Sequence, residues 1–205
     1  MDSELDLRYR LRHQAVLVDM AAEIETFITD LVGGIPRIDR VQARAKSPDR
    51  FLAKATKEEE GVRKYLDPIS EIQDQIGARI ITFYLSDVTA ICDHIEKYFR
   101  HIEKRSVLPE SSAEFGYFGF HYIIGVPTDV LRDEWTETEV PGFFELQIKT
   151  LFQHAWSEAN HDLGYKELSG ALMPDDKRRM AWASAQAWGA DQIFDELHRN
   201  GDQAA

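Results

Sequence analysis

The chain has 205 residues, and 36 acidic residues against 24 Lys and Arg give it a formal net charge of −12. An acidic excess of this size argues against a protein that coats nucleic acid through its overall charge. Hydrophobic residues make up 43% of the chain and charged residues 29%, which excludes an intrinsically disordered protein and suits one domain with helical appendages.

Residues 4–31 form the first predicted element, a long amphipathic helix, because apolar side chains recur every three or four positions. The glycines and the proline of residues 33–36 end it. The Ser-Pro pair at residues 47–48 predicts the cap and first turn of a second helix, which runs toward the acidic residues 58–60. A short helix with a serine cap is predicted over residues 70–76.

The middle of the chain predicts strands in alternation with helices. The β-branched and aromatic run at residues 78–84 predicts a buried strand, and the apolar face of residues 86–99 predicts a helix. A loop is expected at residues 108–116. Two more strands are predicted at residues 120–126 and 143–148.

An acidic insert around Trp135 separates these two strands and predicts a hairpin or a surface excursion. Residues 150–162 predict a helix, and Pro174 begins a last helix that reaches about Leu197. Strands that alternate with helices indicate an α/β (α+β) fold, a mixed β-sheet flanked by helices.

Residues 36–54 depart from the acidic average, because six basic side chains against two acidic ones give this window a charge of +4. On the predicted helix Arg50 and Lys54 are four residues apart and share a face. Basic residues at a helix N-terminus suit a polyphosphate, since backbone N–H groups and the helix dipole add to their charge. The alternative is a solvated basic surface. The basic residues are Arg37, Arg40, Arg44, Lys46, Arg50 and Lys54.

Carboxylates of separate elements form a second candidate site. Asp74 lies near the end of the short predicted helix, and alternation along the last strand places Glu145 on one face with Gln147 and Lys149. Two such carboxylates are able to hold Mg²⁺ together with substrate phosphates. The alternative is a polar strand face turned to solvent.

Two further patterns have both a structural and a functional interpretation. Aromatic residues alternate with glycine at residues 115–122, which predicts either a turn that feeds the core or a ring that stacks on a nucleobase. His154, Glu158 and His161 share one helix face, but the His-Glu-x-x-His order of zinc proteases is absent. Packing is therefore preferred to a metal site at these three residues.

The single cysteine, Cys92, excludes an intramolecular disulfide and a thiolate metal cluster. No apolar stretch approaches the roughly 20 residues of a membrane span, and the N-terminus lacks a signal-peptide pattern. We therefore expect a cytoplasmic protein with no membrane partner.

Taken together in this order, five motifs resemble the synthetase domain of RelA/SpoT-type enzymes, which make guanosine tetra- and pentaphosphate alarmones. The resemblance runs from about Val41 to Lys166, and the chain looks like a stand-alone small alarmone synthetase with a nucleotidyltransferase-like fold. The motifs are RAKSPDRFLAK at residues 44–54, IQDQIGARII at 72–81, GYFGFH at 116–121, ELQIKT at 145–150 and HAWSEANHDLGYK at 154–166.

The resemblance implies an activity: transfer of the β,γ-pyrophosphoryl group of ATP to the ribose 3′-hydroxyl of GTP or GDP, with release of AMP. Such chemistry needs charge neutralisation and positioning more than covalent help. Glu145 is also placed to accept the hydroxyl proton. By the resemblance, ATP is held by Arg44, Lys46, Lys54 and Arg79, Mg²⁺ by Asp74 and Glu145, the acceptor guanine by stacking on Tyr117, and the rest of the acceptor by His121, Gln147 and Lys149.

Departures from the family pattern keep other functions open; they occur at Arg50, Phe115, Phe118 and Lys149. One alternative is a toxin-like relative, paired with an antitoxin, that modifies adenosine nucleotides or the 3′ end of tRNA. The basic residues 97–105 would then grip the RNA backbone, or else form a solvated helix end. Another alternative is a catalytically inactive nucleotide sensor, against which the retained Asp74 and Glu145 argue.

The resemblance also suggests an organisation for the chain within a single synthetase domain. It has an N-terminal helix at residues 1–35, a catalytic core at 36–166 and a C-terminal helical extension at 167–205. The terminal helices carry apolar residues that predict either a homo-oligomer or packing on the core.

Overall fold

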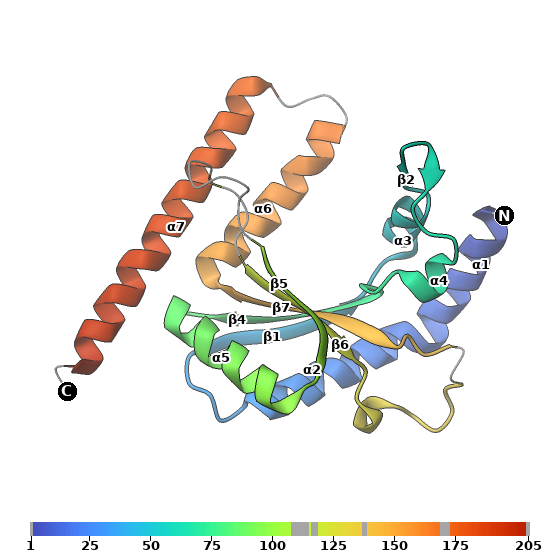
Figure 1. Ribbon diagram of the computed structural model, residues 1–205, viewed down its shortest axis with the longest axis horizontal. Helices are drawn as coiled ribbons and strands as arrows, with labels where there is room; N and C mark the ends of the chain where they lie inside the picture. The colour runs from blue at the N-terminus through green and yellow to red at the C-terminus, as the bar shows by residue number, and fades with distance from the viewer. Residues whose placement is uncertain (1, 108–114, 116–118, 137–138, 169–172, 204–205) are drawn as a thin grey trace.

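The computed structural model describes residues 2–107, 115, 119–136, 139–168 and 173–203. Within these residues the centre of the protein is a mixed five-stranded sheet (Figure 1). In sheet order its strands are β1 (Ile38–Ala45), β4 (Ile76–Thr82), β7 (Phe143–Thr150), β6 (Gly119–Gly125) and β5 (His101–Val107). β4 and β7 run parallel, and the other neighbouring pairs are antiparallel. The predicted α+β fold with a mixed sheet is confirmed.

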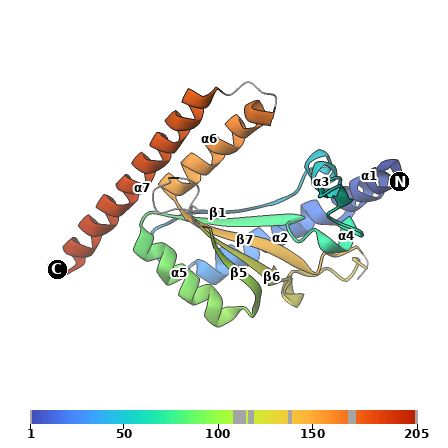
Figure 2. The same cartoon turned by 45° about the horizontal axis from the view of Figure 1, so that its top comes forward.

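Helices cover the two faces of the sheet differently (Figure 2). They are α1 (Asp2–Arg12), α2 (Val18–Val32), α3 (Pro48–Ala55), α4 (Pro68–Glu71), α5 (Leu85–Tyr98), α6 (Leu151–Leu168) and α7 (Pro174–Gln203). α2 and α5 pack against one face, whereas α6 rises from the end of β7 over the other face, with α7 alongside it. A π-helical turn, His13–Leu17, joins α1 to α2.

The alternation of side chains along the strands separates an apolar face from a polar one. On β7, Leu146 and Ile148 are fully buried, while Glu145 and Gln147, which alternate with them, are partly exposed. The buried side chains pack with Ile24 of α2 and other apolar residues of the core. The polar face is therefore left free to line a site.

Most of the predicted elements are present. The long N-terminal helix is confirmed as α1, the π turn and α2, and the helix that begins at Pro48 is α3. The predicted strands correspond to β4, β6 and β7, and the remaining long helices to α5, α6 and α7. The acidic insert between β6 and β7 contains a short 3₁₀ helix, Thr128–Val130, and links two antiparallel neighbours. The predicted loop at residues 108–116 lies, except for residue 115, outside the described residues.

Three sequence predictions were wrong in position. The helix that begins at Pro48 stops at Ala55, because Glu58–Glu59 (β2) and Val62–Arg63 (β3) form a small hairpin. The short helix predicted over residues 70–76 is α4, which begins at Pro68 with Asp67 as its N-cap, and Ile76 already belongs to β4. Residues 101–105 were expected to end a helix but form part of β5.

Candidate active site

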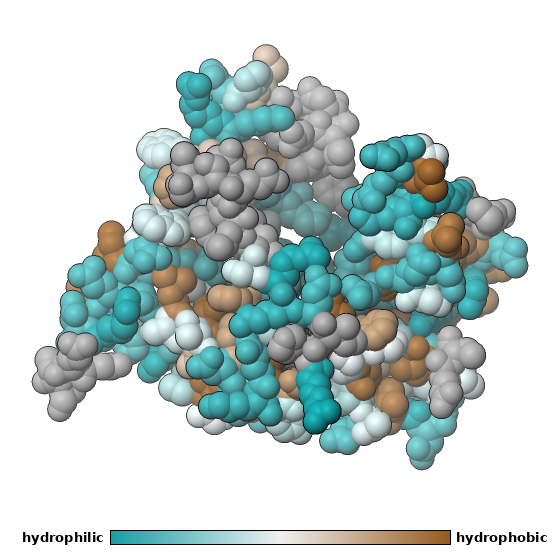
Figure 3. All heavy atoms as spheres, in the orientation of Figure 1, coloured by the Kyte–Doolittle hydropathy of each residue, from teal (hydrophilic) through white to brown (hydrophobic). Residues whose placement is uncertain are grey.

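The parallel pairing of β4 with β7 gathers the polar side chains of several strands on one face of the sheet. Arg79 of β4 stands beside Gln147 of β7, and Gln147 also pairs with His121 of β6. Glu145 faces Gly77, which has no side chain and so leaves the space above β4 open. Figure 3 shows that hydrophilic side chains border the hollow between the lobe of α6 and α7 and the lobe of α3 and β2.

A first cavity of about 280 Å³ opens above β1 and β4. Its basic side chains come from β1, α3, β4 and the segment between β1 and α3: Arg44, Lys46, Arg50 and Arg79. Burial lowers the pKa of Arg44, and the like charges of Arg79 and Arg50 lower it further. Cations that repel one another in this way are stabilised when an anion enters, so the cavity suits a polyanion.

A second cavity of about 360 Å³ lies next to the first, toward β5 and β6. Lys54 of α3, Arg105 of β5 and His121 of β6 are among the residues that line it. Arg105 also donates a hydrogen bond of 2.7 Å from Nη2 to Oε1 of Glu103. This cavity is likewise suited to a charged ligand.

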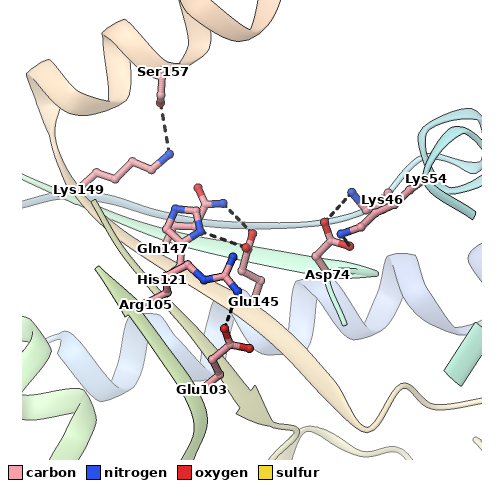
Figure 4. A network of polar contacts seen from close by, with 10 residues as sticks. All are labelled: Lys46, Lys54, Asp74, Glu103, Arg105, His121, Glu145, Gln147, Lys149 and Ser157. Atoms are coloured by element: carbon pink, nitrogen blue, oxygen red, sulfur yellow. Dashed lines mark hydrogen bonds and ion pairs between the residues drawn. The ribbon is translucent and has the colours of Figure 1, made fainter. Parts of the chain in front are cut away.

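Asp74 and Glu145 line both cavities and therefore stand where the two meet. Asp74 belongs to the turn between α4 and β4, where Nζ of Lys46 lies 2.9 Å from Oδ2 and Nζ of Lys54 lies 3.0 Å from Oδ1 (Figure 4). The turn is tied to the segment before α3, since the Lys46 N–H donates to the Gln75 carbonyl oxygen at 2.8 Å. The predicted carboxylate pair is thus brought to one place, although Asp74 is not on a helix.

Two neighbours keep Glu145 ionised. Its Oε1 lies 3.2 Å from Nδ1 of His121, and its Oε2 accepts a 2.7 Å hydrogen bond from Nε2 of Gln147. Burial raises the pKa of Glu145, but these hydrogen bonds and the charges of His121 and Lys54 outweigh burial and bring the pKa to about 2. Glu145 therefore carries its negative charge at any physiological pH.

The two carboxylates fit a magnesium site in the chemistry of their donors. Hard oxygen ligands from one or two carboxylates, completed by phosphate oxygens and water, are the usual protein contribution to bound Mg²⁺. Each of the two side chains keeps 21% of its surface accessible, so both remain reachable from the cavities.

The N-terminal half of α6 covers the far end of the same sheet face. Lys149 is only 4% exposed, and its Nζ donates a 3.3 Å hydrogen bond to Oγ of Ser157. Burial, followed by the charge of Arg79, lowers the pKa of Lys149 to about 8. Arg79 pairs with Glu158 at 2.8 Å. A salt bridge thus joins α6 to β4 beside the first cavity.

The geometry can now be compared with known proteins. Residues 43–169 match the family model for the region found in RelA / SpoT proteins. The chain belongs to the RelA/SpoT family. The family predicted from the five motifs is thereby confirmed.

Relatives of this RelA/SpoT chain include GTP pyrophosphokinase YjbM of Bacillus subtilis (strain 168), which is 28% identical over 165 residues, 78% of this chain and 72% of YjbM. Among solved structures, small alarmone synthetase 1 from Bacillus subtilis has a TM-score of 0.74 at 22% identity and covers 97% of both chains. The same synthetase bound to its product pppGpp has a TM-score of 0.69 at 22% identity, with 95% of this chain and 97% of that chain covered. These structures share the fold of this chain.

Most site residues predicted from the RelA/SpoT motifs lie together around the two cavities, but some positions differ from expectation. Gln147, predicted at the acceptor, lines the first cavity, and Lys54, predicted at ATP, lines the second. Lys149 lies beneath α6 and lines neither cavity. Tyr117 and Phe118 lie outside the described residues.

Two other predictions can be compared with the structure. Among the described residues no group of three His, Cys, Asp or Glu side chains could hold a metal ion, and the packing interpretation of residues 154–161 stays a prediction. In the basic stretch 97–105, Lys104 pairs with Glu96 and Arg105 with Glu103, so carboxylates offset part of the charge proposed for RNA. Phe115 packs edge-on against Trp188, with ring centroids 5.8 Å apart.

The sequence analysis missed the residues of α1 that hold the segments carrying Lys46 and Asp74 in place. The Tyr9 hydroxyl of α1 donates a 2.9 Å hydrogen bond to the Lys46 carbonyl oxygen, and the Tyr9 ring stacks on Phe51 of α3. Arg12 of α1 donates a 2.8 Å hydrogen bond to Oε1 of Gln75, the residue after Asp74. Only an aromatic and a cation on an otherwise amphipathic helix hint at these contacts, because their partners lie 37 and 63 positions away.

Proposed function

We propose that this chain is a GTP pyrophosphokinase, which transfers the β,γ-pyrophosphate of ATP to the 3′-hydroxyl of GTP or GDP, forms the alarmone (p)ppGpp and releases AMP. The observation that carries the proposal is the position of Asp74 and Glu145, which line two adjacent cavities at their junction. A group-transfer enzyme with two nucleotide substrates needs this arrangement, since donor and acceptor must meet at one charged centre. Membership of the RelA/SpoT family and the similarity to YjbM support the same reaction.

ATP is assigned to the first cavity. Arg44 and Arg79 come from the adjacent strands β1 and β4, and Lys46 follows β1 directly. Guanidinium groups stack on a base as readily as they pair with phosphate, so the two arginines suit adenine and the triphosphate. Arg50 takes part in the same cavity and adds to its positive charge.

The guanosine nucleotide is assigned to the second cavity. In this cavity His121 and Arg105 are the hydrogen-bond donors for phosphate oxygens. Lys54 also lines the cavity and pairs with Asp74. The product-bound structure of small alarmone synthetase 1, which contains pppGpp, is a relative that supports a guanosine acceptor. Stacking of the guanine on Tyr117 remains a prediction, and for Lys149 we propose support of α6 rather than direct acceptor contact.

The reaction requires one bond to form and one to break. The ribose 3′-hydroxyl gives its proton to water or to Glu145 as its oxygen attacks the β-phosphorus of ATP, the bond between that phosphorus and the α-phosphate oxygen breaks, and AMP leaves with the electron pair. Mg²⁺, held by Asp74, Glu145 and phosphate oxygens, would neutralise charge on the transferred group. Glu145 has two candidate roles, metal ligand and acceptor of the hydroxyl proton; its pKa of about 2 favours the first, because so weak a base accepts a proton poorly.

The test is a product assay with ATP, Mg²⁺ and one acceptor at a time, chosen from GTP, GDP, GMP, ATP and deacylated tRNA. We expect AMP and 3′-pyrophosphorylated guanosine with GTP or GDP, and their loss in Glu145→Gln and Asp74→Asn. Glu134→Gln, which changes an exposed carboxylate away from both cavities, is the matched control and should retain activity.

Other outcomes separate the alternative functions. Transfer to adenosine nucleotides or tRNA alone would replace this proposal with a toxin-like activity, for which an antitoxin partner would be sought. Nucleotide binding by calorimetry without AMP release from any acceptor would identify a sensor that lacks catalysis. Wild-type activity in Glu145→Gln would refute the assignment of the site.

We also propose self-association through the terminal helices. Large apolar side chains of α7 are exposed in the single chain, namely Trp182, Ile193, Phe194 and Leu197. Apolar surface of this kind is covered in a homo-oligomer. Light scattering after gel filtration should report a mass above that of one chain, and Phe194→Glu should lower it.

No helix in the described part of the chain is both long and apolar enough to cross a bilayer.

A further inference from the structure

A third cavity, of about 270 Å³, is separated from the proposed catalytic site by the sheet itself. It lies between α5, α6, α7 and the start of β6. Phe120 of β6 lines it, whereas the next residue, His121, points to the opposite face of the sheet and lines the second catalytic cavity. On α6, Trp156 lines this cavity, while Ser157 contacts Lys149 on the catalytic face. The cavity is thus a separate site that shares a helix with the first.

The walls of this third cavity are aromatic and its floor carries one carboxylate. Trp156, Trp188 and Phe120 supply the rings. Asp191 of α7 is only 3% exposed, and its Oδ2 accepts a 2.8 Å hydrogen bond from Oγ1 of Thr150. Its other oxygen, Oδ1, is buried and has no hydrogen-bond partner among the described residues. A buried carboxylate oxygen left in this way is costly unless a ligand donates to it.

The structural role of Asp191 does not account for its charge. One acceptor oxygen is enough to hold the Thr150 hydroxyl, and the amide of an asparagine would supply that oxygen without a buried charge. Burial raises the pKa of Asp191 to about 6, only partly opposed by the Thr150 hydrogen bond, so the group is still mainly ionised at neutral pH. A negative charge is kept where the fold needs only a polar atom.

The charge of the lining limits the ligand. None of the described residues that line this cavity is Lys, Arg or His, so among them a nucleotide phosphate would meet a carboxylate without a compensating cation. Aromatic faces attract cations through the ring quadrupole, and a carboxylate adds a charge-assisted hydrogen bond. The lining therefore favours a compact cation with an apolar body.

We propose that the cavity between α5, α6 and α7 is a binding site for a small arylalkyl amine or aryl amidine, whose cationic head donates to Oδ1 of Asp191 while its ring packs against Trp156 and Trp188. The site is additional to the proposed transferase activity and does not depend on it. Thr150, the partner of Asp191, directly follows Lys149 at the end of the strand that carries Glu145. A ligand on Asp191 would thus be connected to this strand through Thr150, and it would contact α6 through Trp156.

Benzamidine, with neutral benzamide and anionic benzoate as isosteric comparisons, tests the site. Binding is followed by ¹H–¹⁵N spectra of the Trp156 and Trp188 indoles, assigned by single Trp→Phe replacement. We expect benzamidine to shift the signals of these two indoles saturably. The affinity for benzamide should be lower by about tenfold or more, and benzoate should not bind. Absence of saturable shifts with benzamidine, or equal affinity for benzamide, would overturn the proposal.

Variants localise the interaction. Asp191→Asn should weaken benzamidine by about tenfold while leaving benzamide unchanged, and Glu196→Gln, an exposed carboxylate on the same helix, should bind as wild type. If Asp191→Asn fails to fold, Ala187→Met, which fills the cavity from α7, should abolish binding of both benzamidine and benzamide. Wild-type benzamidine affinity in Asp191→Asn or in Ala187→Met would refute the site.

Discussion

Replacement of Arg12 by Met should destabilise the whole protein, although Arg12 is remote from the proposed catalytic carboxylates. Arg12 is 8% exposed, and its guanidinium donates from Nε to the Glu139 carbonyl oxygen at 2.6 Å and from Nη1 to Oε1 of Gln75 at 2.8 Å. A third contact, to the Ile69 carbonyl oxygen at 3.4 Å, is long and adds little. Arg12 thereby joins α1 to the turn that carries Asp74 and to the segment before β7.

The magnitude follows from the two short hydrogen bonds. Each hydrogen bond to a charged group contributes about 1.5–3 kcal/mol, and in the variant the Gln75 acceptor stays buried and the Glu139 acceptor partly buried. Removal of a buried cation returns part of this loss, because its desolvation cost disappears. We expect Arg12→Met to lower the free energy of unfolding by about 3 kcal/mol, which for a chain of this size is a fall of about 6–12 °C in melting temperature.

Urea unfolding followed by circular dichroism is the measurement, with thermal melting in parallel. Arg10→Met is the matched control, since Arg10 lies on the same helix, is exposed and pairs only with Asp6 and Asp49 at the surface. It should leave the midpoint nearly unchanged. A free energy of unfolding of Arg12→Met within about 0.5 kcal/mol of the wild-type value would contradict the stabilising role of the Arg12 hydrogen bonds, because a change that small is typical of surface substitutions.

Three further predictions concern pH. Glu145 has a native pKa of about 2, so its ionised form stabilises the fold above its ordinary pKa of 4.5, and this contribution is lost as the pH falls toward 2. His121→Ala should raise the pKa of Glu145. Acid unfolding of this variant, followed by circular dichroism, should then begin at a higher pH than in wild type. Lys149 has a native pKa of about 8, so between pH 8 and its ordinary pKa of 10.5 the unfolded state holds more protons than the native state. The urea midpoint of the wild type should therefore rise with pH over this range relative to that of Lys149→Met. Asp191 has a native pKa of about 6, so between its ordinary pKa of 3.8 and pH 6 the native state holds more protons than the unfolded state. Over that range the wild type should lose stability relative to Asp191→Asn as the pH rises. Stability curves that run parallel in wild type and variant would contradict the pKa given for Lys149 or for Asp191.

The sequence predicted the catalytic face of β7 well, because alternation along a strand has a period of two and does not depend on distant partners. Glu145 and Gln147 face the first cavity for this reason. Asp74 was identified as a carboxylate of the site but placed on a helix, since a short apolar spacing cannot distinguish the end of a helix from the start of a strand. Its lysine partners come from a segment 20 to 28 positions earlier, which only the fold brings close.

Edge strands account for the two strands of the five-stranded sheet that the sequence analysis missed. β1 and β5 form the two edges of the sheet and carry many charged side chains, as edge strands commonly do to prevent pairing with other chains. Such a strand resembles a solvated basic stretch in sequence. The buried polar contacts of Arg12 and Asp191 were equally unpredictable, because their partners are set by how helices dock on the sheet.

The position of β7 in the sheet has a consequence for synthesis of the chain. β7 is the last strand in sequence, yet it lies at the centre of the sheet between β4 and β6. Until residue 150 has left the ribosome, β1–β4 and β5–β6 are two separate antiparallel pairs, each with an open edge, and Glu145 has no place beside Asp74. A nascent or truncated chain that stops before β7 therefore has neither a closed core nor the proposed catalytic centre, and such a chain would be prone to aggregation through its unpaired edges.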